Sequence, residues 1–188
     1  MLELDLRRQP SIRSTDWLRC LPSASRWILH GGPAVRALAA PVWGVELSET
    51  ACRAALAGSR AALWLGPDEY LLLELAPGER TDELQAALAG ALEQALAGTP
   101  HALVDVSHRQ FALEVSGAHA ATMLNAGCPL DLDLTEFPVG MCTRTVFAKA
   151  DVVLWRTRAD AFHVEVWRSF AGYVSGLLAE IAREFYPL

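Results

Sequence analysis

The sequence predicts an α+β fold in which antiparallel sheets are flanked by helices. Two short apolar runs joined by turn residues, then a segment with helical periodicity, occur around Leu63–Leu96 and again around Leu154–Phe185. Both copies carry a tryptophan in the first strand, at Trp64 and Trp155. Two β-β-α units in the same order indicate an internal repeat, and hairpins covered by helices are typical of this fold class.

The elements of the first half follow from local patterns. A strand is expected near Trp27, while the Gly and Pro residues between 30 and 59 leave that stretch unassigned. Residues 61–65 and 70–75 form the expected hairpin, because the residues between them supply turn chemistry. Thr81 can cap the helix that follows. The leucines of this helix recur every four residues, at Leu84, Leu88, Leu92 and Leu96.

The second half repeats this scheme. Two strands, 102–106 and 111–115, are expected to follow the helix of the first half. The strands of the second half are expected at 143–148, 152–156 and 162–167, after a short helix at 118–126. A longer helix closes the chain, and Ser169 can cap it. Its apolar residues fall at the spacing of one helix face, at Phe170, Tyr173, Val174, Leu177, Leu178, Ile181 and Phe185.

Length and composition limit the number of domains. The chain has 188 residues, 52% of them hydrophobic, so it is globular and can bury a sizeable core. Residues 1–26 lack a sustained period and are expected to form an extended N-terminal arm. Residues 27–188 are expected to form a single domain made of two similar halves, about 27–105 and 106–188.

Charge and cysteine content disfavour several functions. The net charge is −6, and one lysine with scattered arginines does not make the basic surface that nucleic acid requires. Acidic residues at the start do not resemble a secretory signal, and no apolar run is long enough to span a membrane, so a cytoplasmic location is expected. The cysteines lie far apart and are expected to be separate buried thiols: Cys20, Cys52, Cys128 and Cys142.

Motifs for cofactor chemistry are scarce. No phosphate-binding loop is present, because Pro33 removes an amide donor from the one Gly-rich turn that resembles such a loop. His163 and Glu165 lie two residues apart on an expected strand and can form an acid–base pair or part of a metal site. A strand surface that faces solvent or a partner is the simpler interpretation, because a catalytic zinc needs three ligands.

Two further groups contain residue types used in catalysis or metal binding. Asp105, Ser107 and His108 are the types found in a hydrolytic triad, but neighbours this close in sequence seldom point at one atom. The acidic residues at 131–136 lack the glycine and the spacing of a calcium-binding EF-hand loop. Both groups are therefore expected to be structural or solvated.

Tryptophan and arginine are the unusual part of the composition. The chain has six tryptophans and only one lysine among its 16 basic residues, and Trp and Arg are enriched at the centres of protein interfaces. Trp17 and Trp27 are expected either in such an interface or in the core. Buried tryptophan is ordinary, and an alanine- and arginine-rich composition also fits a general bias of the source genome.

Five ordered blocks of the sequence resemble the gamma subunit of heterotetrameric sarcosine oxidase. These blocks are Ala62–Leu72, Val104–Gln110, Gly127–Asp133, Phe137–Thr145 and Val166–Tyr173. The similarity covers about residues 27–185. The first block is shared more widely with folate-binding aminomethyltransferases, so the resemblance also implies their folate-binding-domain fold.

The resemblance implies a non-catalytic accessory subunit that assembles with alpha, beta and delta chains. Such a complex oxidatively demethylates sarcosine to glycine, with formation of hydrogen peroxide and methylene-tetrahydrofolate. The family's gamma chain carries no cofactor; FAD, FMN, NAD, tetrahydrofolate and zinc belong to the partner subunits. Some folate-binding relatives have a Lys-Gly-Cys motif, and the comparable residues 137–145 here contain no lysine, which argues against folate chemistry in this chain.

No catalytic, cofactor-binding or metal-binding residue is therefore expected. Arg109, Arg144 and Arg168 lie in the resembling blocks and are expected at a partner interface, because Arg suits carboxylates across a partner surface. Internal ion pairing is the alternative. Two other functions remain open: a free-standing folate- or one-carbon-binding protein, and a small metal-dependent enzyme that uses His163 and Glu165.

Overall fold

The computed structural model describes residues 12–75 and 82–186, so the predicted Thr81 cap lies outside the described residues. This part of the chain divides into two compact units. Unit 1 contains residues 12–21, 108–139 and 144–186, and unit 2 contains residues 22–75, 82–107 and 140–143. The predicted division into an arm and one domain with two halves stays a prediction.

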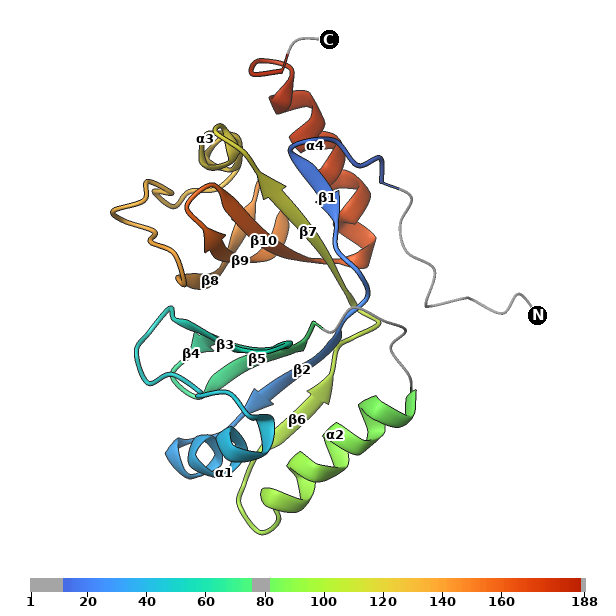
Figure 1. Cartoon of the computed structure of the whole chain (residues 1–188), viewed down its shortest axis with the longest axis vertical. Helices are drawn as coiled ribbons and strands as arrows, with labels where there is room; N and C mark the ends of the chain where they lie inside the picture. Colours follow the sequence, from blue (N-terminus) through green and yellow to red (C-terminus); the bar gives the residue numbers. More distant parts are fainter. Residues whose placement is uncertain (1–11, 76–81, 187–188) are drawn as a thin grey trace, which may run out of the picture. The chain divides into compact units, whose positions relative to one another are not determined.

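Unit 2 contains a five-stranded antiparallel sheet. Its strands lie in the order β3 (Ala54–Ala57), β4 (Arg60–Gly66), β5 (Glu69–Glu74), β2 (Ser25–His30) and β6 (Ala102–Asp105). The predicted hairpin is confirmed as β4 and β5, with Ala62 opposite Leu72. Helices α1 (Pro33–Trp43) and α2 (Asp82–Ala95) lie on the same side of this sheet (Figure 1).

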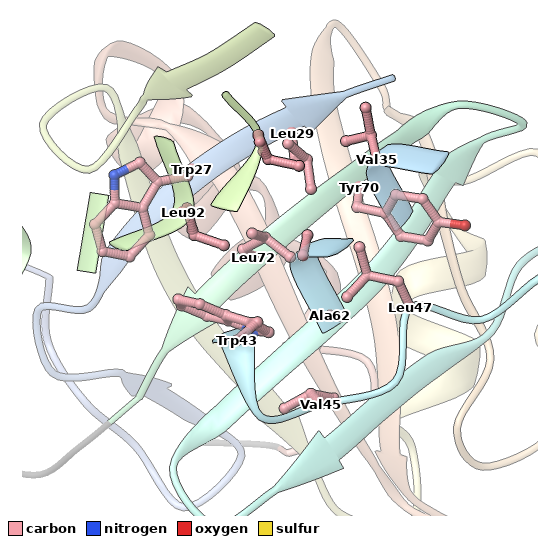
Figure 2. Packing of buried hydrophobic residues seen from close by; sticks show 12 residues of the cluster. Trp27, Leu29, Val35, Trp43, Val45, Leu47, Ala62, Tyr70, Leu72 and Leu92 are labelled. Atoms are coloured by element: carbon pink, nitrogen blue, oxygen red, sulfur yellow. The ribbon is translucent and has the colours of Figure 1, made fainter. Parts of the chain in front are cut away.

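The core of unit 2 lies between this sheet and its two helices (Figure 2). Trp27 of β2 meets Trp43 of α1 edge to face, with ring centroids 5.7 Å apart. Leu72 of β5 and Leu92 of α2 pack into the same cluster. Leu96 belongs to the cluster and Leu88 packs against it, so this part of the leucine repeat faces the sheet, as its period predicts. Leu84 at the start of α2 is 44% exposed, so the predicted stripe is only partly buried.

Helix α1 occupies part of the stretch that the sequence left unassigned. It begins at Pro33, which suits a first helical position because the missing N–H would have no intrahelical partner there. Gly44 ends it in the left-handed conformation with φ 76°, and its N–H donates to Ala40 O at 2.9 Å. Pro33 and Gly44 therefore bound a helix in a stretch that the sequence pattern left unassigned, and Pro41 lies inside this helix.

Unit 1 contains a second five-stranded sheet. Its strands lie in the order β1 (Leu18–Cys20), β7 (Gln110–Ser116), β10 (Ala161–Trp167), β9 (Ala150–Arg158) and β8 (Cys142–Phe147). Its helices are α3 (Ala120–Asn125) and α4 (Ala171–Ala182), which contact each other. The expected strands of this half are confirmed.

The predicted Ser169 cap is wrong. A 3₁₀ turn, η1 (Arg168–Phe170), follows β10 directly and contains Ser169, and Phe170 occupies the position before α4 without a capping side chain. The extended conformation that a capping serine needs is instead adopted by Trp167, the last residue of β10.

The predicted internal repeat is confirmed and is longer than the hairpin and helix alone. In chain order β2, α1, β3, β4, β5 and α2 correspond to β7, α3, β8, β9, β10 and α4. The sheet orders correspond as well, with β6 next to β2 in one sheet and β1 next to β7 in the other. The strand β1, which precedes the first copy, therefore completes the sheet of the second copy.

The described residues before 27 contain more regular structure than the expected extended arm. Leu18 lies opposite Val115 in the ladder between β1 and β7, and β2 begins at Ser25. A three-residue strand is too short to show a period, so its pairing with β7 decides its structure. Within the described residues, no helix has both the length and the apolarity needed to cross a membrane.

Gly127 follows α3 at a position where the chain has no room for a side chain. A Cβ there would lie 2.7 Å from Cε2 of the buried Phe147 ring. We expect Gly127→Ala to lower the free energy of unfolding by about 1–3 kcal/mol, because the ring must shift within a packed core. Urea unfolding followed by circular dichroism measures this change.

Gly90 provides the matched control. It lies inside α2, and a Cβ there meets no atom within 4 Å. Gly90→Ala should leave stability unchanged or raise it by about 0.5–1 kcal/mol, because alanine favours a helix interior over glycine. Equal unfolding curves for the two variants would contradict the assigned packing around Gly127.

Candidate protein interface

Trp17 and Trp27, which were expected either at an interface or in the core, are both buried. Trp27 is 1% exposed and belongs to the core of unit 2. Trp17 is also buried, and its ring stacks on Tyr186 with centroids 6.1 Å apart. Both side chains thus have partners within the chain and offer little surface to another protein.

Two of the three predicted arginines lie together at one end of β7 and β10. The Arg168 N–H donates to Arg109 O at 2.8 Å, and Arg168 Nε donates to His108 O at 3.0 Å. These bonds connect the loop before β7 to the turn after β10. The Arg109 side chain is exposed, and its guanidinium lies 5.2 Å from the centre of the Trp167 ring.

Three exposed aromatic side chains surround this junction. Trp167 at the end of β10, Phe170 of η1 and Tyr173 of α4 are 43%, 38% and 40% exposed. The rings of Phe170 and Tyr173 meet edge to face with centroids 6.4 Å apart. Together with Arg109 they form a surface that we name the aromatic patch.

The sequence pattern placed two of these rings on the apolar face of the closing helix, whereas the structure leaves both exposed. Phe170 and Tyr173 fit the apolar spacing of the closing helix, yet the buried residues of α4 are Ala171, Val174, Ser175, Leu178 and Ala182. The apolar stripe is wider than the face that the sheet covers. That excess width is the signal that could have marked these rings as surface residues.

Arg144 lies apart from the aromatic patch along the chain. It is exposed on β8, which is at the edge of its sheet opposite β1. It therefore does not share the junction that joins Arg109 and Arg168. Its expected role at a partner interface stays a proposal.

His163 and Glu165 are not on a solvent-facing strand surface. Their side chains are 6% and 0% exposed, and His163 Nε2 lies 2.7 Å from Glu165 Oε1. The His163 ring also packs beside Trp155. The described residues contain no group of three His, Cys, Asp or Glu side chains that could hold a metal ion. The pair therefore has the geometry of a buried structural contact.

The triad-like residues also have structural partners. Ser107 Oγ accepts the Arg26 N–H at 2.8 Å and the Gln85 amide at 3.1 Å. Asp105 Oδ1 accepts the Ser107 N–H at 2.8 Å, which closes a local turn. This buried hydroxyl holds β2, α2 and the end of β6 together and has no position from which to attack a substrate.

The acidic loop is ordered by its own hydrogen bonds. Asp133 Oδ1 accepts the Thr135 N–H at 2.9 Å and the Thr135 hydroxyl at 2.7 Å. These bonds lower the pKa of Asp133, because they stabilise the carboxylate form. The acidic residues of this loop therefore belong to a hydrogen-bonded turn at the surface.

The segment comparable to the folate relatives' Lys-Gly-Cys motif has no reactive thiol. Cys142 is fully buried, its Sγ lies 3.5 Å from Trp64 O, and burial raises its pKa to about 12. A protonated buried thiol is a poor nucleophile. Cys142 is therefore a poor candidate for a reactive nucleophile. All four cysteines are free thiols. Cys128 and Cys142 are buried as expected, whereas Cys20 and Cys52 are partly exposed, so the expectation of four buried thiols is wrong for these two.

We expect Cys142 to resist alkylation in the folded protein. At pH 8.5 iodoacetamide should modify it at least tenfold more slowly than in urea, because both burial and the raised pKa suppress thiolate attack. Peptide mass spectrometry reads the modification site by site. Rapid labelling of Cys142 without denaturant would show that this segment opens readily.

The fold places the chain in a structural class. It is similar to the aminomethyltransferase T of the glycine cleavage system from Bartonella henselae, with a TM-score of 0.63 at 15% identity. That similarity covers 88% of this chain and 46% of the other. The predicted α+β, aminomethyltransferase-like fold is confirmed.

The sequence identifies the family within this class. The sarcosine oxidase, gamma subunit family matches residues 30–184, and the chain belongs to that family. A chain of the heterotetrameric sarcosine oxidase from Corynebacterium sp. U-96 superposes with a TM-score of 0.80 at 31% identity. This match covers 89% of this chain and 84% of that chain.

Curated relatives agree with this assignment. The sarcosine oxidase subunit gamma of Arthrobacter sp. is 39% identical over 111 residues, which are 59% of this chain and 51% of the relative. The subunit gamma of Corynebacterium sp. (strain U-96) is 34% identical over 125 residues, which are 66% of this chain and 57% of the relative. The chain spans a little over half the length of these relatives.

Proposed function

We propose that this chain is a non-catalytic accessory subunit of a heterotetrameric sarcosine oxidase. The observation that carries the proposal is the superposition on a chain of the Corynebacterium heterotetramer over most of both chains. The family match over residues 30–184 supports it. The reaction of the whole complex would be the oxidative demethylation of sarcosine to glycine, with hydrogen peroxide and methylene-tetrahydrofolate as further products.

The proposal assigns the chemistry to the partner subunits. FAD, FMN, NAD, tetrahydrofolate and zinc would be held by the alpha, beta and delta chains. The candidate reactive groups of this chain support that division. His163 and Glu165 are buried against each other, Ser107 is hydrogen-bonded within the chain, and Cys142 is buried and protonated.

The chain would then contribute surface and stability to the assembly. Arg109 and Arg168 remain the predicted interface residues that lie next to an exposed aromatic surface. The four free thiols fit a reducing compartment, so the proposal places the assembly in the cytoplasm.

Purification of the tagged chain from its native host under gentle conditions tests the proposal. We expect three co-purifying polypeptides, identified by sequence as the other oxidase chains, a flavin absorbance, and hydrogen peroxide production that depends on sarcosine. The chain expressed alone should show no such activity.

A colourless chain without these partners would contradict the proposal. Calorimetry with tetrahydrofolate then separates the alternatives, because a free-standing folate-binding protein gives saturable heat. Sarcosine oxidation by the isolated chain would contradict a non-catalytic role.

A further inference from the structure

The aromatic patch has an unusual composition for a surface that contacts only water. Trp, Tyr and Arg are the residues most often responsible for binding energy at protein interfaces. Here Trp167, Phe170 and Tyr173 are each more than a third exposed, and they gather within seven residues of chain. Apolar rings clustered in this way on a surface mark a contact site more often than isolated ones do.

The backbone beneath the patch is held in place before any partner binds. The bonds from Arg168 to the carbonyl oxygens of Arg109 and His108 connect the two segments that carry the patch. The 3₁₀ turn η1 then leads directly into α4, whose buried residues anchor Tyr173. A surface whose backbone is already ordered loses less conformational entropy when it binds.

The patch also has a distinct charge. Residues 108–110 and 167–173 include Arg109 and Arg168 and no aspartate or glutamate, although the whole chain carries a net charge of −6. Arg109 contacts Trp167 and forms no salt bridge within the described part of the chain. The surface is therefore apolar and locally basic, and an acidic group is its natural counterpart.

A buried polar atom lies next to the patch. Gln110 is opposite Trp167 in the β7–β10 ladder, and its Oε1 has no hydrogen-bond donor among the described residues. A buried acceptor without a donor costs about 1–3 kcal/mol. Among the described residues, this acceptor beside Trp167 is therefore left without a hydrogen bond.

We propose that the aromatic patch, formed by Arg109, Trp167, Phe170 and Tyr173, is the surface on which a partner subunit docks. The docking segment of the partner presents an acidic side chain to Arg109 and aliphatic or aromatic side chains to the three rings. This proposal rests on the proposed assembly into an oxidase. A second copy of the chain is a poor occupant, because a twofold contact centred here would bring two Arg109 side chains together.

The complete complex, formed by co-expression of this chain with the three other oxidase chains of its host, provides the test. Arg109→Glu and Tyr173→Ala should each lower the fraction of this chain found in the complex about tenfold. A loss of this size is expected when a residue contributes strongly to the binding free energy of an interface. The melting temperature of each isolated variant should stay close to that of the unchanged chain, because both side chains are exposed.

Matched controls are available at exposed positions outside the patch. Arg183→Glu changes an exposed arginine directly after α4 that forms a salt bridge with Glu180 of that helix. Leu38→Ala shortens an apolar side chain that is 42% exposed. Both controls should assemble as the unchanged chain does. A photo-crosslinker placed at Tyr173 should form a bond to one of the partner chains.

The outcomes separate this proposal from the one on which it rests. If the unchanged chain assembles and the patch variants assemble within twofold of it, the docking surface lies elsewhere. A crosslink to a second copy, or unchanged hydrogen exchange of residues 167–173 on assembly, overturns the proposal as well, even if a variant fails to fold. If the unchanged chain does not assemble at all, the proposed function itself fails.

Discussion

Replacement of Glu165 by leucine should lower the free energy of unfolding by about 3–5 kcal/mol. Glu165 has no exposed side-chain surface and lies 2.7 Å from His163 Nε2 in the middle of the β7–β10–β9 sheet. Its neighbours across the ladders are Ala112 and Val153. Loss of the carboxylate leaves the buried imidazole without this partner, and an unpaired buried polar or charged group is costly. Urea unfolding at pH 7 followed by circular dichroism measures the change.

A double variant shows whether the cost comes from the orphaned partner. His163→Leu combined with Glu165→Leu removes both polar groups, and a buried pair replaced by apolar side chains is often neutral or better. We expect the double variant to be more stable than Glu165→Leu alone. If the two changes simply added, the contact would not act as a pair. If Glu165→Leu unfolded like the unchanged chain, the assigned burial would be incorrect.

Replacement of Arg156 by methionine should be similarly destabilising, by about 3–5 kcal/mol. Arg156 lies in β9, and its buried guanidinium donates to Leu132 O at 3.0 Å and Phe137 O at 2.8 Å in the loop before β8, and to Ala159 O at 2.6 Å directly after β9. It also packs against the Phe162 ring at 4.7 Å. Burial lowers the pKa of Arg156, so the hydrogen bonds must offset the cost of burying a cation.

Methionine retains the apolar stem and removes every donor, so at least two buried acceptors lose a charged hydrogen bond worth about 1.5–3 kcal/mol each. The loop of residues 130–139 should then open, and limited proteolysis next to the exposed Leu134 should accelerate. Mass spectrometry of the fragments locates the cut.

Arg158 on the same strand is the matched control. Its side chain is 58% exposed, and it pairs at 3.6 Å with Glu114 and at 3.8 Å with Asp160. Arg158→Met should cost less than about 1 kcal/mol, because exposed ion pairs contribute little. Equal losses for the two arginine variants would show that position 156 carries no special anchoring role.

Local patterns were sufficient for most elements of the repeat. The hairpin formed by β4 and β5, the leucine stripe of α2 and the three strands β8, β9 and β10 all follow from periods and turn residues close in sequence. Helix α1 and strands β1 and β3 were missed, and for α1 and β1 the reasons differ. Pro33 reads as a breaker although it suits a helix start, and β1 has too few residues to show a period.

The candidate interface was only half visible in the sequence. Arg109 and Arg168 could be selected because they lie in the sequence blocks that resemble the family. Trp27, which was also selected, lies in the core. Phe170 and Tyr173, which were expected on the apolar face of the closing helix, are exposed. The spacing of apolar residues in a helix predicts which side chains share one face of that helix. It does not predict how much of the face the sheet covers, because coverage depends on strands that are distant in sequence.

By itself the sequence determined the α+β class, the repeat and the family, since each depends on local periods or on ordered blocks of residues. The tertiary structure decided which polar groups are reactive surface and which are structural. His163, Glu165 and Ser107 were candidates for chemistry, and the packed chain buries all three side chains. Ser107 is bonded to Arg26, which is 81 residues away in the chain. Burial and hydrogen bonding are properties of the packed chain, and long-range pairing fixes them.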